Sequence, residues 1–222
     1  MREMQLRFGL MILLLLPGAV AVADEQPVTL PLPAPSQAGG LPLMEALKQR
    51  KTTREFTNDK LPAQTLSDLL WAAFGINRPA TDHRTAPSAM NSQEVDLYVA
   101  TADGVYLYEP KPHRLKPLLN RDLRAKTSGQ EFARQAPVVV IYVADLPRLA
   151  KAKPESRPFY AGIDTGCIVQ NVYLYCASAG LGAVVYDLDR QPLSDALGLG
   201  PDQKITLCQA VGFPRPGAVE KR

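Results

Sequence analysis

Residues 137–144 read PVVVIYVA, a nearly continuous run of β-branched and aromatic side chains. A strand that is buried on both faces has this composition, because neither of its faces meets water. The run therefore predicts the central strand of a sheet that is covered on both sides.

Three further strands are predicted around this run. EVDLYVAT (94–101) and GVYLYE (104–109) alternate apolar and polar residues on either side of Asp103-Gly104, a dipeptide typical of a hairpin turn. KITLCQAVGFP (204–214) predicts the last strand. Hairpin pairing among interspersed helices predicts an α+β domain, or a mixed domain of three layers, without internal repeats.

Two helices are predicted before the strands, at about 42–50 and from Leu61-Pro62 onward, since proline is tolerated in a first helical turn. The second helix buries one face, because its apolar residues recur at helical spacing, and Gly75 ends it. Residues 75–93 then predict a long polar loop, which is uncommon inside a compact domain and often functional. The apolar face consists of Leu66, Leu69, Leu70, Ala73 and Phe74.

A long helix is predicted at about 157–179, and no charged residue occurs from Thr165 to Tyr186. Such a helix either spans a membrane or lies in a large core or a subunit interface. Its polar residues and glycines favour the core or interface.

Residues 1–23 predict a secretory signal peptide. A basic start, MREMQLR, precedes an apolar run and the small residues Ala21-Val22-Ala23, so cleavage is expected after Ala23. The alternative is an uncleaved membrane anchor, which Pro17 and Gly18 and the short run disfavour. The mature protein is expected to be exported by the Sec route to the periplasm or the medium. Residues 24–40, rich in Pro and Gly, predict an extended arm before the domain at 41–222.

Charge and composition exclude several classes of function. A formal net charge of +3, with no basic stripe, argues against nucleic acid as a partner. The three cysteines and two histidines show no metal-ligand spacing, so we predict no metal site. No residue is assigned a catalytic acid–base role.

RKTTREF (50–56) brings three cations and two threonines together. Guanidinium groups and hydroxyls bind phosphate with directional hydrogen bonds. The stretch is not a glycine-rich phosphate loop, so it does not indicate a nucleoside triphosphate. The alternative is a solvated surface cluster.

Five segments in chain order resemble the nitroreductase superfamily of FMN flavoproteins, over residues 42–216. Within it, the chain looks most like the SagB-type, thiazole-oxidase-like oxidoreductases. The segments are the helix followed by RKTTR (50–54), LSDLLWA (66–72), PSAMNSQE (87–94), the Gln170-Asn171 helix with GLGAVVYDLD (180–189), and AVGFP (210–214).

The resemblance implies a mixed, mainly antiparallel sheet flanked by helices, and an intertwined homodimer with FMN at its interface. The phosphate and ribityl chain would be bound by Arg50, Lys51, Thr52 and Arg54, with the Thr53 backbone. Pro87, Ser88, Ala89, Met90 and Asn91 would lie along the isoalloxazine edge. Val184, Val185, Tyr186 and Asp187 would face the ring, with one backbone N–H near its reactive nitrogen. Arg215 would be a second phosphate contact, with Lys221 or Arg222 as alternatives.

The function that this resemblance implies is an exported FMN-dependent oxidoreductase. It would transfer hydride or electrons between a donor and a small organic substrate. NAD(P)H is the donor of typical family members but is scarce outside the cytoplasm, so a different reductant, or dehydrogenase or oxidase chemistry, stays open. Two alternatives remain: a non-catalytic exported module that binds flavin or another ligand, and a structural or interaction protein with an empty site.

Overall fold

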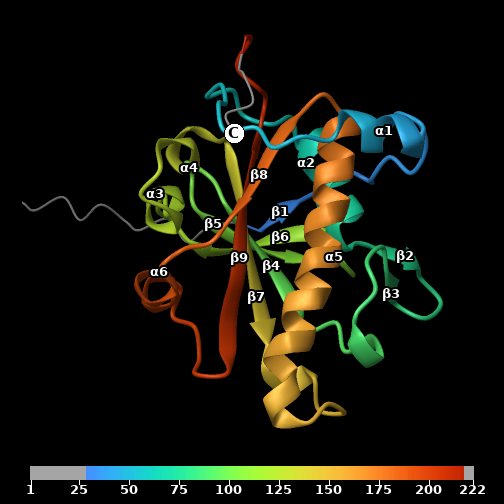
Figure 1. Cartoon of the computed structure of the whole chain (residues 1–222), viewed down its shortest axis with the longest axis vertical. Helices are drawn as coiled ribbons and strands as arrows, with labels where there is room; N and C mark the ends of the chain where they lie inside the picture. Colours follow the sequence, from blue (N-terminus) through green and yellow to red (C-terminus); the bar gives the residue numbers. More distant parts are fainter. Residues whose placement is uncertain (1–28, 218–222) are drawn as a thin grey trace, which may run out of the picture.

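The computed structural model describes residues 29–217 (Figure 1). The predicted signal peptide, residues 24–28 of the predicted arm, Lys221 and Arg222 lie outside the described residues. The main sheet has seven strands in the order β1-β6-β5-β4-β7-β9-β8, and every neighbouring pair is antiparallel. The predicted sheet is therefore confirmed. Its strands are β1 (Leu30–Pro31), β4 (Val95–Ala100), β5 (Val105–Glu109), β6 (Arg114–Leu119), β7 (Val138–Asp145), β8 (Gly182–Tyr186) and β9 (Gln203–Gly212).

The PVVVIYVA run forms β7 in the middle of this sheet, as predicted. Its side chains alternate between two cores, because successive residues of a strand point to opposite faces. Val138, Val140 and Tyr142 belong to one core, whereas Val139 and Ile141 belong to the other.

Helices cover both faces of the sheet. On one face, the cluster around Tyr142 includes residues of α2 (Ala63–Phe74) and α5 (Arg157–Ser178), and α1 (Leu43–Gln49) packs against α5. On the other face lie α3 (Arg124–Thr127), α4 (Glu131–Gln135) and α6 (Arg190–Leu197). Figure 1 shows α5 running along the sheet from end to end. The three predicted helices and the Asp103-Gly104 hairpin are confirmed.

The long polar loop predicted at 75–93 contains short elements that were not predicted. β2 (Ile76–Arg78) pairs with β3 (His83–Arg84), and a single 3₁₀ turn, η1 (Ala89–Asn91), follows. These strands have no apolar alternation that sequence reading could detect. Side chains hold the segment instead: Arg84 Nε donates to Gln93 Oε1 at 2.7 Å.

Several elements were not predicted from the sequence. β1 and β6 form one edge of the sheet, and Pro31 and Pro117 lie within them. The short helices α3, α4 and α6 and the 3₁₀ turns η2 (Leu146–Arg148) and η3 (Pro154–Ser156) were also missed. In residues 29–217, no helix has the length and apolar character needed to cross a membrane.

Candidate functional site

The RKTTREF segment lies across the ends of β8 and β9, at the edge of the sheet. The Thr53 N–H donates to the Ala183 carbonyl on β8 at 2.9 Å. Beyond β9, the Arg215 N–H donates to the Glu55 carbonyl, also at 2.9 Å. Backbone hydrogen bonds therefore bring three of the five resembling segments together.

Two glycines allow this close approach. Gly182 on β8 pairs with Gly212 on β9. A Cβ atom at Gly182 would lie 2.7 Å from Thr53 Cγ2, and one at Gly212 would lie 2.4 Å from Pro137 Cδ and 3.2 Å from Phe56 Cδ1. Thr53 therefore lies closer to β8 than a side chain at Gly182 would allow, and Gly212 leaves room for Pro137 and, less tightly, for Phe56.

Four cations at this edge of the sheet are free of counter-charges. Within the part of the chain that the structure describes, none of their side chains makes an ion pair or a hydrogen bond, and three of them are exposed. Arg50 is half-buried, and its guanidinium carbon lies 5.5 Å from the centroid of the Tyr173 ring. A cluster of guanidinium and ammonium groups without counter-charges suits an anion. The four are Arg50, Lys51, Arg54 and Arg215.

Tyr173 links this cluster to β8, and sequence reasoning missed it. Its hydroxyl accepts a hydrogen bond from the Val185 N–H at 2.9 Å and lies 3.4 Å from Thr52 Oγ1. The residue is 7% exposed. The available signal was a tyrosine in the uncharged stretch that starts at Thr165, because a buried tyrosine hydroxyl requires a polar partner.

The side chains of residues 184–187 do not face one side together. Val184 and Tyr186 point into the core beneath α4 and α6, whereas Val185 packs on the α5 side. The Tyr186 hydroxyl lies 2.7 Å from Thr127 Oγ1. Burial raises the pKa of Tyr186. Tyr186 therefore has a structural role in the core. Asp187 is exposed and forms an ion pair with Arg190 at 2.7 Å.

The PSAMN segment (87–91) does not join the cationic cluster within one chain. The Ala89 N–H donates to Asp164 Oδ2 at 2.7 Å. Asp164 precedes Tyr173 by nine residues on α5, which corresponds to roughly 13 Å along the helix. The segment therefore lies toward the opposite end of α5.

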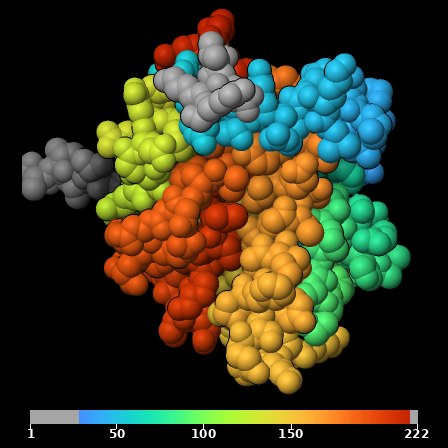
Figure 2. All heavy atoms as spheres, viewed as in Figure 1, coloured from blue at the N-terminus to red at the C-terminus, as the bar shows by residue number. Residues whose placement is uncertain are grey.

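Two hollows lie along α5, one beside the cationic cluster and one toward the start of the helix. One of about 190 Å³ is lined by Lys51, Tyr173 and Pro214. Another, of about 290 Å³, lies between α5 and β9 and is lined by Gly162 and Thr206. Figure 2 shows a furrow between α5 and the segment of β8 and α6, with β9 at its floor.

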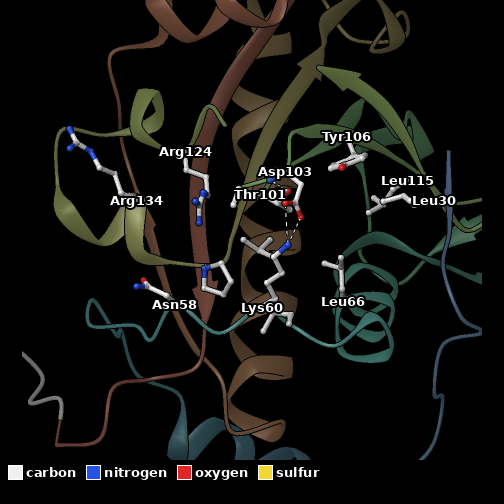
Figure 3. A pocket seen from close by; sticks show the side chains of 14 residues that line it. Leu30, Asn58, Lys60, Leu66, Thr101, Asp103, Tyr106, Leu115, Arg124 and Arg134 are labelled. Carbon is white, nitrogen blue, oxygen red and sulfur yellow. Dashed lines mark hydrogen bonds and ion pairs between the residues drawn. The ribbon is translucent and has the colours of Figure 1, made fainter. Parts of the chain in front are cut away.

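A larger cavity of about 430 Å³ lies beside the β4–β5 turn and contains none of the predicted site residues. The Lys60–Asp103 ion pair, 2.7 Å long, lies among its lining side chains, next to Tyr106 and Leu66 (Figure 3). It is therefore separate from the cationic cluster.

No group of three or more His, Cys, Asp or Glu side chains in residues 29–217 is placed to hold a metal ion. The three cysteines are free thiols. Cys176 and Cys208 are buried, and burial raises the pKa of each thiol. These two cysteines therefore pack as small apolar residues in the core.

The fold and this edge define an α+β protein with a cluster of unpaired cations, among the described residues, at one margin of an antiparallel sheet. The chain belongs to the nitroreductase family, whose family model matches residues 47–213. A candidate nitroreductase of Methanocaldococcus jannaschii is 32% identical over 155 residues, which cover 64% of this chain and 76% of that protein.

Solved structures agree with this assignment. The crystal structure of a candidate nitroreductase from Ralstonia eutropha is 41% identical, with a TM-score of 0.81 over 84% of this chain and 90% of that one. A candidate nitroreductase from Desulfovibrio desulfuricans, solved in complex with FMN, is 23% identical, with a TM-score of 0.59 over 83% and 92% of the two chains. The predicted family and the predicted nitroreductase-like oxidoreductase are confirmed; the SagB-type subgroup stays a prediction.

Proposed function

We propose that this chain is an FMN-dependent oxidoreductase that passes hydride or electrons between a donor and a small organic substrate. The free cationic cluster beside β8 and β9 is the observation that carries the proposal. The family assignment and the FMN complex of the Desulfovibrio desulfuricans relative support it. When bound, the flavin supplies the hydride chemistry, while the protein supplies position and electrostatics.

The residues present fit the phosphate end of FMN. A phosphate monoester carries about −1.5 to −2 charges at neutral pH and has three strong acceptor oxygens. Arg50, Arg54 and Arg215 offer guanidinium donors without counter-ions, Lys51 adds an ammonium group, and Thr52 adds a hydroxyl. We assign these five side chains, together with the Thr53 backbone, to the phosphate and ribityl chain.

The backbone of residues 184–187 is our candidate for the surface along the flavin ring. Tyr173 fixes this backbone through the Val185 N–H, so that N–H is already engaged. The donor near the reactive nitrogen of the flavin would then be another N–H of the same segment. The buried Tyr186 side chain stabilises the strand from the opposite face.

Residues 87–91 fit the proposal only when a second subunit is present, since they lie far from the cationic cluster of their own chain. We therefore propose a homodimer in which this segment lines the flavin held by the partner. Helix α5 exposes Phe159 (68%) and Ile163 (48%), and α1 exposes Leu43 and Met44. Figure 2 shows α5 on the surface along its length, with α1 at its upper end. Helices with such an apolar outer face suit a subunit interface.

We further propose that the mature protein is exported after cleavage at Ala23, to the periplasm or the medium. The predicted signal peptide is the support for this location. NAD(P)H is then one candidate donor, and a reductant of the exterior is the other. FMN would be acquired after export if the chain crosses the membrane unfolded.

One experiment tests the proposal in two stages. The protein is incubated with FMN, desalted and scanned in the visible range, and we expect about one flavin per subunit. NADH and NADPH are then added separately under anaerobic conditions, and bleaching of the flavin band identifies a competent donor. Retained flavin that no donor or substrate reduces would indicate a non-catalytic binding module. A colourless protein would contradict the proposal.

A further inference from the structure

Glu94 directly follows the PSAMNSQ segment and is fully buried, at 0% exposure. Among residues 29–217, neither of its carboxylate oxygens has a hydrogen-bond partner. A buried carboxylate without a donor is strongly unfavourable, so such a group either finds a partner or takes up a proton.

The group that faces Glu94 is a second carboxyl, Asp164 on α5, which is only 4% exposed. Two carboxylates offer acceptors alone, so they repel each other as long as both are ionised. One proton between them removes the repulsion and creates an O–H donor.

The electrostatics of Glu94 agree with this arrangement. Burial, and then the nearby charge of Asp164, raise the pKa of Glu94 to about 7. Arg148 is the cation that acts in the opposite direction. Its guanidinium is already bound to Asp96 at 2.8 Å and Asp145 at 3.0 Å, so it does not neutralise the pair.

The segment that this pair supports is held in an unfavourable conformation. Met90, Asn91 and Gln93 have φ angles of 55°, 54° and 49°. Such left-handed angles are uncommon outside glycine and persist only where the surrounding structure fixes them.

Three contacts of the backbone fix this segment. The Ala89 N–H donates to Asp164 Oδ2 at 2.7 Å, and the Gln93 N–H donates to Ser88 Oγ at 2.9 Å. Arg148 Nη1 donates to the Gln93 carbonyl at 3.3 Å. Asp164 is the contact that ties the segment to α5.

We propose that Glu94 and Asp164 share a single proton, and that this carboxyl pair positions residues 88–93 for contact with the cofactor. The cofactor part of this inference rests on the proposed function, whereas the pair itself does not. When the proton leaves, two buried negative charges repel, and the hydrogen bond from Ala89 to Asp164 weakens. The segment then opens.

The expected pH dependence follows from the direction of the shift. Both the folded and the unfolded chain hold the Glu94 proton well below pH 4.5, the ordinary pKa of this group. Between pH 4.5 and about 7, the folded state binds the proton more tightly, so the stability that it contributes is lost as the pH rises. The loss is complete above about pH 7.

Hydrogen exchange on the full chain without flavin tests the pair. We expect the protection factors of amides in residues 88–93 to fall by about tenfold or more between pH 5 and pH 8, since one pKa unit corresponds to tenfold in an equilibrium. Glu94→Gln keeps a side-chain donor and removes the titration, so its protection should stay level. Glu131→Gln, on the exposed face of α4, is the matched control and should behave as the wild type.

Asp164 is tested with two substitutions. Asp164→Asn keeps an oxygen that can accept the Ala89 hydrogen bond and should preserve protection at 88–93. Asp164→Leu removes that acceptor and should lower protection there but not in β7. The proposal would be overturned if protection at residues 88–93 depended on pH equally in the wild type and in Glu94→Gln. Unchanged protection of these residues in Asp164→Leu would also overturn it. Flavin retention, measured separately, reports on the proposed function alone.

Discussion

Gly182 and Gly212 face each other across β8 and β9, and the RKTTREF segment lies over both. Thr53 occupies the space above Gly182, and Phe56 occupies part of the space above Gly212. The Gly-Leu-Gly and Val-Gly-Phe-Pro segments therefore share one physical purpose. Because the two glycines have no side chains, the cationic segment can pack directly on the backbone of the sheet.

Gly182→Ala should destabilise the protein by about 1–3 kcal/mol, the usual range for overpacking. The added methyl would lie 2.7 Å from Thr53 Cγ2, and Thr53 is fixed by its backbone bond to Ala183. Gly129→Ala is the control, because no atom lies within 4 Å of a Cβ atom there. Chemical denaturation measures both variants. A Gly182→Ala protein as stable as the wild type would disprove the docking account.

Tyr173→Phe should lower the free energy of unfolding by about 1–3 kcal/mol, because the buried Val185 N–H loses its acceptor. It should also weaken flavin binding several-fold by loosening β8. Tyr175→Phe is the control on the same helix: its hydroxyl donates to the Thr65 carbonyl at 3.3 Å, away from β8. Flavin affinity should stay unchanged in that variant. Equal flavin affinities for the two variants would argue against the role of Tyr173.

His113 should titrate below its ordinary pKa of 6.5, since burial lowers it despite a raising effect from the Pro33 carbonyl and Asp68. Ser67 Oγ donates to the Pro33 carbonyl at 2.6 Å, so it accepts from His113 Nε2 at 2.7 Å. Tyr108 then donates to Nδ1 at 3.0 Å, which requires a neutral ring.

The folded state therefore favours the neutral imidazole of His113. Its contribution to stability is present above pH 6.5 and is lost as the pH falls through the folded-state pKa. A chain with two histidines allows direct titration by NMR. A His113 pKa at or above 6.5 would contradict the hydrogen-bond assignment.

Ile163→Lys should convert the proposed homodimer into a monomer, because it places a charge on the uncharged outer face of α5. Light scattering after size exclusion should then give the mass of one chain, against twice that mass for the wild type. Lys116→Ala, an exposed change on β6, should leave the mass unaltered. A wild-type monomer at all concentrations would rule out the proposed interface.

The sequence predicted the elements whose signals are local. The β-branched run of β7, the periodicity of α2, the length of α5 and the Asp103-Gly104 turn all depend on neighbours within a few residues. β1 and β6 were not predicted, because strands at the edge of a sheet tolerate proline, as at Pro117, and lack clear apolar alternation. The β2–β3 ribbon was not predicted, because contacts between polar side chains stabilise it and leave no apolar pattern in the sequence.

The candidate site was predicted as a set of segments but not as an arrangement. Tyr173 is 121 residues from Thr52 in the chain, so no local pattern reveals their proximity. Val185 and Tyr186 point to opposite faces of the sheet, because side chains alternate along a strand. A linear motif does not show this difference. The separation of residues 87–91 from the cationic cluster also depends on the path of α5.

The most direct test compares the equilibrium affinities of the protein for FMN and for riboflavin, which lacks only the phosphate. If the cluster holds the phosphate, the affinity for FMN should exceed the affinity for riboflavin by about a hundredfold or more, since each charge-assisted contact contributes roughly 1.5–3 kcal/mol. Arg50→Ala should reduce that ratio about tenfold or more and leave riboflavin affinity nearly unchanged, whereas Lys116→Ala should alter neither value. Equal affinities for FMN and riboflavin in the wild type would contradict the assignment of this edge as the phosphate site.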